Sequence, residues 1–553
     1  MMATRDLLIE IGTEELPPKA LQRMRDALQA SLDKLLDENY LEHGSSQAYA
    51  APRRLAVLIR DVPEAQPDRE VNKRGPALQA AFDEDGKPTR PAEGFARSCG
   101  VGVSERQQLE TDKGTWLAFT STVAGQPATE IIPGLLEKAL KALPMPKRMR
   151  WGSSDIEFVR PIHWIVLLFG DTAVKARILV VNSDRYSRGH RFHHPHNIAI
   201  GSPESYAETL QQTGKVIADM AQRRASIEAQ ASEAGVALGG QAHIEPALLD
   251  EVNALVEWPV AISGGFDKRF LEVPAEALIS SMQDHQKYFP VMDADGKLLP
   301  HFITIANISS SQPQQIRAGN ERVIRPRLED AVFFWNQDRK QSLHSRAAQL
   351  DHMTFQKKLG SLGDKQRRIS AIASHIAAEL NIDVPQVQRA AALCKCDLVT
   401  SMVNEFPDLQ GIMGRYYASH DGEDAAVAEA LDEQYQPRFA GDVLPASGPG
   451  QALAIAERLD TLTGIFAIGQ TPTGDKDPFG LRRSALGLLR ILIEKQLDLD
   501  LTRLIDTAAQ LLPAEVQAEA ITEDLFSFMM ERLRAYYLDA GYDNHIFAAV
   551  LAW

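Results

Sequence analysis

Two aspartates stand among small and apolar residues at helical spacing, and their carboxylates are the first candidates for chemistry. Asp397 lies in AALCKCDLVTSMVNEFPDLQG, and Asp460 lies in IAERLDTLTGIFAIGQ. Positions three and four residues apart share one face of a helix. The predicted faces group Asp397 with Leu393, Thr400 and Asn404, and Asp460 with Ala456, Thr463 and Ala467. A carboxylate is costly to bury alone, so each aspartate needs a hydrogen-bonding partner, a metal ion or a functional reason.

The setting of these aspartates resembles the HD-type metallo-phosphohydrolase domain, with an X-Asp on one helix and A-x-R-x-D-x-L-x-G on another. The resemblance implies a metal bound by a His, a His-Asp pair and a distant Asp. Asp397 and Asp460 match the carboxylates, and His375 or His352 could supply the first His. Cys396 stands where the paired His belongs, and Mn²⁺ and Mg²⁺ prefer nitrogen and oxygen ligands over thiolate. We therefore expect degenerate HD positions at His375, Cys396, Asp397 and Asp460, with no metal and with structural aspartates. An active metal-dependent phosphohydrolase is the alternative.

Clusters of basic residues are the second kind of candidate site, because cations that neutralise phosphates supply most of the affinity for nucleic acid. The candidate phosphate-contacting residues are Lys147, Arg148 and Arg150, then Arg188 and Arg191, and then Lys476, Arg482 and Arg483. In the last group, Asp477 is a predicted N-cap and Pro478 a predicted first helical residue, and a helix N-terminus favours anions. The alternative for each cluster is a solvated face or neutralisation by acidic neighbours.

Histidines gather in the segment RGHRFHHPH, at positions 190, 193, 194 and 196. Their spacing fits no tetrahedral structural zinc pattern, and no Cys or carboxylate is close by in the sequence. A basic, aromatic-containing segment that contacts RNA or a partner chain, a metal site and a plain structural role all stay open.

Hydrophobic periodicity defines the elements that must position these residues. Strands are predicted at 5–16, 54–62, 116–123 and 163–169, with a helix at 20–36, which indicates α/β or α+β layers. Helices are then predicted at 202–235 and 244–257, strands at 260–262, 288–292 and 301–308, and a hairpin turn at 293–296. A helix at 317–346 is expected to break or restart at Pro326. The Pro-, Gly- and charge-rich segment 63–103 is expected to contain mobile loops, and the chain after Arg503 is predicted to be helical.

Composition bounds the class of protein. The chain has 553 residues, so several domains are expected, and 44% apolar with 24% charged residues is ordinary for a globular protein. The start lacks a signal-peptide pattern, no apolar run is long enough for a membrane span, and three cysteines without a C-x-x-C pair argue against a disulfide framework. We expect a cytoplasmic protein. The formal net charge of −15 means that any RNA contact must come from local basic patches.

Several long segments, in order along the whole chain, closely resemble the β-subunit of the bacterial two-subunit glycyl-tRNA synthetase. They are LLIEIGTEELPPKAL, VNSDRYSRGHRFHHP, LISSMQDHQKYFPVMDADGKLLPHFITIANI, GNERVIRPRLEDAVFFWNQDRK, MVNEFPDLQGIMGRYYA and TPTGDKDPFGLRR. The resemblance implies an α2β2 enzyme whose α-subunit uses ATP and Mg²⁺ to attach glycine, while the β-subunit grips tRNA(Gly). No catalytic residue and no cofactor is then expected in this chain, and neither HIGH nor KMSKS appears in it. A non-enzymatic RNA-binding assembly protein is a further alternative.

The expected fold is multidomain α+β, with a mixed α/β N-terminal half, an all-α HD-like bundle and a helical C-terminus. The boundaries are 1–200 for the N-terminal region, 201–335 for a middle module, 336–505 for the degenerate HD-like domain and 506–553 for the last helices. The resemblance likens the middle module to the editing-like module of the phenylalanyl-tRNA synthetase β-subunit. It likens the last helices to the start of an anticodon-binding module, and the family's greater length leads us to expect a C-terminally truncated chain.

Overall fold

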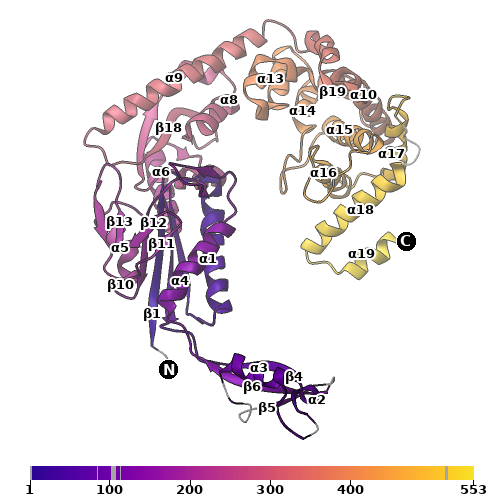
Figure 1. The fold of residues 1–553 in the computed structure, drawn as a ribbon. Helices are drawn as coiled ribbons and strands as arrows, with labels where there is room; N and C mark the ends of the chain where they lie inside the picture. The colour runs from indigo at the N-terminus through magenta and orange to yellow at the C-terminus, as the bar shows by residue number, and fades with distance from the viewer. Residues whose placement is uncertain are drawn as a thin grey trace. The chain divides into compact units, whose positions relative to one another are not determined.

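A computed structural model describes residues 3–83, 85–100, 102, 107–111, 114–516 and 521–552 (Figure 1). The chain divides into two compact units: Met1–Gly265 with Lys287–Gly319, and Phe266–Gln286 with Asn320–Trp553. The first unit carries the large sheets and the second is mainly helical, which confirms the predicted multidomain α+β fold. The finer division at residues 200, 335 and 505 stays a prediction.

The first unit is organised around β1 (Thr4–Thr13), which pairs antiparallel with β3 (Arg54–Pro63) and with β9 (Ile162–Phe169). The strand order is β11-β12-β9-β1-β3-β2, and β10 pairs with β9. The other strands of this sheet are β2 (Ser46–Ala51), β10 (Thr172–Ala173), β11 (Arg177–Ile178) and β12 (Val181–Asp184). Because β12 runs parallel to β9, the sheet is mixed. The strands predicted at 5–16, 54–62 and 163–169 are confirmed.

Alternate side chains of β1 enter two different cores. Leu7, Ile9 and Ile11 pack on the face covered by α1 (Pro18–Glu38) and α4 (Ala128–Ala142). Leu8 packs on the opposite face, with residues of α5 (Tyr206–Gln212). Successive strand residues point to opposite faces, so a strand that is apolar at consecutive positions is covered on both sides. The helix predicted at 20–36 is confirmed as α1, which buries Leu21, Met24, Leu28, Leu32 and Leu36.

The segment 63–103, which is expected to contain mobile loops, also contributes regular structure. It forms β4 (Arg69–Ala77), α2 (Leu78–Ala81) and α3 (Arg90–Cys99), and its sheet is completed in the order β4-β6-β5 by β5 (Gln107–Thr111) and β6 (Gly114–Val123). Ala81, Ala92 and Leu117 make a small core of their own. Sequence reasoning did not predict β4, α2 and α3, because their few apolar positions are far apart in sequence and show little periodicity. That the segment contains mobile loops stays a prediction. Part of the segment, at residues 84, 101 and 103, lies outside the described residues.

A second sheet follows in the order β15-β17-β18-β16. Its strands are β15 (Gln241–Ala242), β16 (Val260–Gly265), β17 (Phe289–Met292) and β18 (Leu298–Ala306), and α6 (Met220–Ala237) and α7 (Pro246–Asn253) pack on it. The hairpin turn predicted at 293–296 is confirmed, since the Asp293 amide donates to the Lys297 carbonyl at 2.8 Å and Gly296 has a φ of 76°. Shorter pairs are β7 (Met149–Arg150) with β8 (Glu157–Phe158), and β13 (Tyr186–Arg188) with β14 (Asn197–Ala199).

In the second unit, α15 (Gly448–Ala467) is the central helix and is buried on nearly all sides. The helices packed on it are α10 (Leu362–Glu379), α11 (Val384–Leu393), α14 (Ala425–Glu433), α16 (Leu481–Glu494), α17 (Leu501–Gln510) and α18 (Ile521–Asp539). The remaining ones include α8 (Ala275–Ser280), α12 (Ser401–Glu405), α13 (Ile412–His420) and α19 (Asn544–Leu551). The helical character predicted after Arg503 is confirmed for the described residues.

Two helix predictions were wrong. The helix expected to carry Leu393, Asp397 and Asn404 on one face ends at Leu393, and a short 3₁₀ turn at Cys396–Val399 precedes α12. Conversely, α9 (Pro313–Asp338) continues through Pro326. A proline inside a helix removes one backbone hydrogen bond and crowds the preceding turn. Here Pro326 is exposed, which lets solvent satisfy the carbonyl group that is freed.

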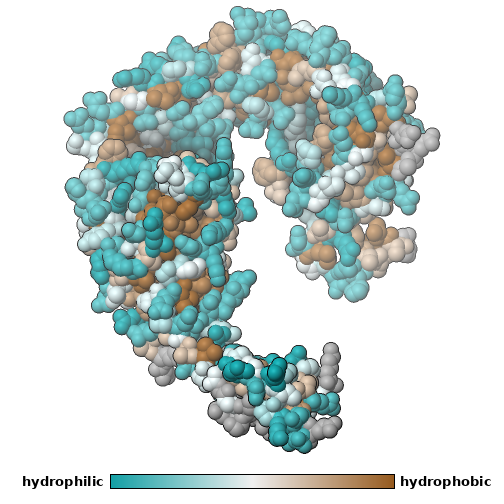
Figure 2. All heavy atoms as spheres, in the orientation of Figure 1, coloured by the Kyte–Doolittle hydropathy of each residue, from teal (hydrophilic) through white to brown (hydrophobic). Residues whose placement is uncertain are grey.

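Among the described residues, no helix is both long and apolar enough to cross a membrane. On the face shown in Figure 2, hydrophilic residues predominate and the apolar residues form separate patches.

Candidate functional site

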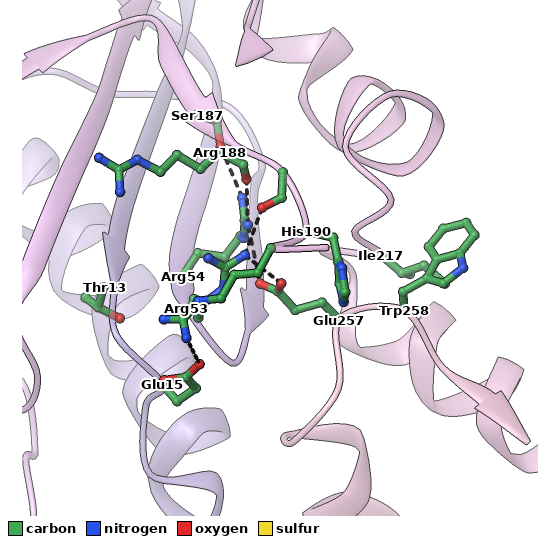
Figure 3. Close-up of polar contacts among 12 residues, drawn as sticks. Thr13, Glu15, Arg53, Arg54, Ser187, Arg188, His190, Ile217, Glu257 and Trp258 are labelled. Atoms are coloured by element: carbon green, nitrogen blue, oxygen red, sulfur yellow. Dashed lines mark hydrogen bonds and ion pairs between the residues drawn. The ribbon is translucent and has the colours of Figure 1, made fainter. Parts of the chain in front are cut away.

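Arg54, at the start of β3, is the centre of a buried polar network in the first unit (Figure 3). Its guanidinium donates to the Ser187 hydroxyl at 3.1 Å, to the Arg188 carbonyl at 2.8 Å and to Glu257 Oε1 at 3.3 Å. Burial opposes the charge of Arg54, but Glu10 and Glu257 outweigh it and raise the pKa of the guanidinium. The Arg54 guanidinium is therefore charged, and its hydrogen bonds hold these segments together inside the first unit.

Arg53 and Glu257 extend this network. Arg53 donates to the Gly189 carbonyl at 2.8 Å and to Glu257 Oε2 at 2.9 Å. Burial tends to raise the pKa of the Glu257 carboxyl, but Arg54 and Arg53 outweigh that effect and hold the pKa below its ordinary value. The Glu257 amide donates to Asn307 Oδ1 at 2.7 Å, so the network joins β3 to the segments flanking β16 and β18.

Glu10 closes the network from β1. Its carboxylate accepts from the Ser187 hydroxyl at 2.7 Å, from the Tyr206 hydroxyl at 2.5 Å and from the Trp164 indole N–H. Burial and the adjacent Glu10 charge raise the pKa of Tyr206, which therefore stays a hydrogen-bond donor. These contacts are all made within the protein, so we interpret the network as a scaffold for the segment at 187–196.

That segment contains two predicted phosphate contacts. The Arg188 side chain is exposed and lies over the Trp164 ring, with 5.1 Å from the guanidinium carbon to the ring centroid. Arg191 pairs with Glu14 and, at 3.1 Å, with Glu15. Arg188 is therefore available to a ligand, whereas Arg191 is already neutralised.

The histidines of the segment have structural contacts. Burial lowers the pKa of His190, and His190 Nδ1 accepts from the amides of Phe192 at 3.2 Å and His193 at 3.3 Å. His193 Nε2 accepts from the Ser309 amide at 2.9 Å. No group of three or more His, Cys, Asp or Glu side chains that could hold a metal ion is found in the described part of the chain.

The structure places Lys147, Arg148 and Arg150 at β7 and in the turn before it. Arg148 donates to the Lys141 carbonyl at 2.9 Å, and Arg150 pairs with Asp155 at 3.7 Å and Glu157 at 3.2 Å. Lys147 is exposed and has no ion-pair partner among the residues described. Of this cluster, Lys147 is the residue free to meet an anion.

The third cluster surrounds the start of α16. Asp477 caps this helix from three residues before the N-cap residue, Gly480, because its carboxylate accepts from the amides of Leu481 at 2.8 Å and Arg482 at 3.0 Å. The prediction that Asp477 is the N-cap residue itself was wrong, although its capping role holds. The Asp477 carboxylate already occupies the helix N-terminus, which weakens the predicted anion site there.

The cations of the third cluster have different roles. Arg482 donates to the Gly474 carbonyl at 2.6 Å and so closes the loop before α16. Lys476 and Arg483 are exposed, and within the described ranges neither forms an ion pair. Lys476 and Arg483 are therefore free to contact a ligand, while Arg482 holds the loop.

Asp460, one of the two candidate carboxylates, is buried on α15 against cations of α10. Arg368 Nε donates to its Oδ1 at 2.5 Å, and Lys365 Nζ donates to its Oδ2 at 3.0 Å. Lys365 also lies 3.4 Å from Glu457, which lies 3.1 Å from Lys395. Both oxygens of Asp460 are thus used by internal cations.

Asp397 is also buried but has a different environment. Its Oδ2 accepts from the Gly411 amide at 2.6 Å. Burial raises the pKa of the Asp397 carboxyl to about 6, despite that hydrogen bond and the nearby Lys395 charge. Because its pKa is raised, the Asp397 carboxyl is protonated, and therefore neutral, more readily than a surface carboxyl.

The other two HD positions, Cys396 and His375, also lack the properties of metal ligands. Burial raises the pKa of the Cys396 thiol to about 12, so the thiolate that a metal would need is disfavoured. Cys396 Sγ donates to the Ala392 carbonyl at 3.6 Å, and His375 lies 3.4 Å from Glu379 on its own helix. These donor groups do not fit a divalent metal. That the aspartates are structural stays a prediction.

Sequence reasoning missed several residues that hold these sites together, namely Glu10 and Glu257 in the first unit and Lys365 and Arg368 in the second. A signal existed for Lys365 and Arg368, which lie three residues apart beside the apolar positions of α10. No comparable signal marked Glu257, because its partners lie about 200 positions away in the sequence.

Comparison with known proteins defines the class of the chain. A sequence model described as "Glycyl-tRNA synthetase beta subunit" matches residues 7–552. The curated relatives include the glycine–tRNA ligase beta subunits of Citrobacter koseri, Salmonella arizonae and Klebsiella pneumoniae. Each is 51% identical over 551 residues, which cover 100% of this chain and 80% of the relative. The chain is thus of the aminoacyl-tRNA synthetase class, as a subunit of a ligase.

More particularly, the chain belongs to the glycyl-tRNA synthetase beta subunit family. The family resemblance noted in the sequence is confirmed. Neither a phosphohydrolase nor a non-enzymatic assembly protein finds support in these comparisons.

Proposed function

We propose that this chain is the tRNA-binding subunit of a cytoplasmic glycine–tRNA ligase of α2β2 composition. In this proposal the α-subunit uses ATP and Mg²⁺ to attach glycine, and the present chain grips tRNA(Gly). The observation that carries the proposal is 51% identity over the whole chain to glycine–tRNA ligase beta subunits.

The distribution of charge supports a role in binding tRNA. The exposed cations without an ion-pair partner in the described residues include Lys147, Arg188, Lys476 and Arg483. Because the chain carries a formal net charge of −15, such unpaired cations are local departures from an acidic surface. They can contact phosphates without first giving up an internal partner.

A phosphohydrolase at the HD positions is not proposed. Asp460 would have to exchange contacts with Arg368 and Lys365 for a metal ion, and Cys396 is held as a buried thiol. Removing an anion from a buried ion pair leaves uncompensated charges and is strongly unfavourable.

The last helices are proposed to belong to an anticodon-binding-type module. On α18 and α19 an apolar groove is lined by Met530, Leu533, Tyr537, Tyr542, Ile546, Phe547, Val550 and Leu551, with Ile493 of α16. Figure 2 shows brown surface over these helices. An exposed apolar surface of this kind is typical of a region that contacts another element or a ligand.

Binding of tRNA(Gly) transcript to the chain together with the α-subunit, measured over a range of salt concentrations, tests the proposal. We expect salt-sensitive binding, and Lys476→Ala with Arg483→Ala should lower the slope of log K against log salt by about 0.7–0.9 for each phosphate that is no longer neutralised. Lys268→Ala with Lys340→Ala removes two other exposed cations of the same unit and serves as the control. Absence of tRNA(Gly) binding by the assembled chains would refute the proposed function.

A further inference from the structure

A groove of about 680 Å³ lies in the first unit between the start of α1 and the segment that follows α4. Its apolar lining consists of Pro17, Pro18, Ala20, Pro144, Met145 and Pro146. Prolines have no backbone N–H and little conformational freedom, so these walls are rigid and offer no amide donors at four positions. The groove therefore presents a preformed apolar surface.

The polar residues of the groove are mainly basic. Lys19 and Arg23, four residues apart on α1, line it, and both are exposed. Neither forms an ion pair with any residue that the structure describes. Lys147, which is also unpaired among the described residues, follows Pro146 directly in the chain.

The nearby acidic side chains have cation partners of their own. Glu251, the acidic residue of the lining, pairs with Lys287 at 3.2 Å. Glu15, just before Pro17, pairs with Arg191. The positive charge of Lys19 and Arg23 is therefore left for a ligand, although the chain as a whole is acidic.

We propose that this groove binds an unpaired segment of an RNA strand, with phosphates on Lys19 and Arg23 and a base or ribose against the proline walls. The inference rests on the proposed function and adds to it a binding site in the first unit. The charge complementarity selects an anionic strand. The apolar walls select an unpaired segment, because a base can enter a groove only where it is not stacked within a duplex.

The test uses the 553-residue chain together with the α-subunit, and two probes: tRNA(Gly) transcript and a single-stranded oligouridine. The test variant is Lys19→Ala/Arg23→Ala. The control variant, Lys34→Ala/Arg177→Ala, removes two exposed cations outside the groove, of which Lys34 lies on the same helix. Both variants change only exposed side chains, so both are expected to fold. Circular dichroism and size-exclusion chromatography of the assembly check this.

For the test variant we expect weaker binding of both RNAs and a salt slope lower by about 1.4, which is two single-strand phosphate contacts of about 0.7 each. The control should keep both the affinity and the slope of the unaltered protein. A bound RNA should also protect Lys19 from acetylation by a lysine-reactive reagent.

The outcomes separate this inference from the proposed function. If tRNA(Gly) binding and its salt slope are the same in the test variant and the unaltered protein, the groove inference is wrong and the proposed function stands. If the test variant instead fails to assemble with the α-subunit but keeps its RNA affinity, the groove is a protein interface and the inference is again wrong. If the unaltered assembly binds no tRNA(Gly), the proposed function itself fails.

Discussion

Arg368 and Asp460 form a two-point contact inside the helical unit, in which Nε donates to Oδ1 at 2.5 Å and Nη2 donates to Oδ2 at 3.3 Å. Lys365 adds a third donor at 3.0 Å. Two-point contacts between a guanidinium and a carboxylate fix orientation as well as energy. This contact ties α10 to α15 at a position where the HD-type pattern would require a metal ligand.

Asp460→Ala should lower the free energy of unfolding by about 3–5 kcal/mol, because it leaves Arg368 buried without its anion and Lys365 with Glu457 alone. Urea unfolding followed by circular dichroism measures this change. The double variant Asp460→Ala/Arg368→Ala should lose less than the sum of the two single variants, since both partners are then absent. The control is Arg367→Ala, because the Arg367 side chain is 62% exposed. This substitution should lower the free energy of unfolding by no more than about 1 kcal/mol. An equal loss of unfolding free energy in Arg367→Ala and Asp460→Ala would contradict the interpretation that the Arg368–Asp460 contact holds α10 to α15.

The HD positions should bind no divalent metal. Purified chain that has been incubated with Mn²⁺, Fe²⁺ or Ni²⁺ and then desalted should contain no stoichiometric metal, because internal cations use both oxygens of Asp460. Elemental analysis checks this, with Asp397→Ala as the comparison. Stoichiometric metal that disappears in Asp397→Ala would show that the interpretation is wrong.

The Asp397 carboxyl should make stability depend on pH. Its pKa of about 6 lies above the ordinary value of about 3.9, so the folded state binds the proton more tightly than the unfolded state does. Stability contributed by the protonated form is present at low pH and is lost as pH rises from about 4 to about 6, by about 3 kcal/mol in total. Asp397→Asn, which keeps an oxygen acceptor for the Gly411 amide, should remove this decline. Asp498→Asn, at an exposed position, is the control, and a decline that persists unchanged in Asp397→Asn would exclude Asp397 as its source.

Glu257→Gln should destabilise the first unit by about 3 kcal/mol at neutral pH, because Arg53 and Arg54 lose their shared anion. The pKa of Glu257 is lowered in the folded state, so its stabilising contribution is present above the unfolded-state pKa of about 4.3. That contribution is lost as pH falls through the lower folded-state pKa. The difference between the unaltered chain and Glu257→Gln, measured by urea unfolding, should therefore shrink under acid conditions. Glu228→Gln is the control, since Glu228 pairs with Arg224 at the surface.

The chain without its partner should not form glycyl adenylate. The ATP-binding signatures HIGH and KMSKS are missing from the sequence, and the family resemblance assigns the use of ATP to the α-subunit. The expected result is no glycine-dependent ATP–pyrophosphate exchange by the purified chain, and exchange once the α-subunit is added. Exchange by the chain alone would mean that an adenylate-forming site lies within these residues.

The local pattern of apolar and polar residues is enough to predict many of the strands and helices of this protein. The pattern of residues 5–16 and the spacing of the leucines of α1 predicted β1 and its covering helix, because backbone geometry alone fixes which side chains share a face. Helical spacing also placed Asp460 among small and apolar residues on one helix face, whereas the resemblance to the HD-type domain marked Cys396 as the departure from a metal-binding pair. The resemblance to the family over the whole chain was also recognised from the sequence.

Tertiary structure decided which charges meet. Asp460 is paired with Lys365 and Arg368, which precede it by 95 and 92 positions, and Arg191 is paired with Glu14 across 177 positions. Whether a cation such as Lys19 is free or neutralised depends on the packing of elements that are far apart in the chain. Sequence periodicity acts over a few residues, whereas an ion pair forms wherever folding brings two side chains within a few ångströms, and the partners of these charges were therefore set by the packing alone.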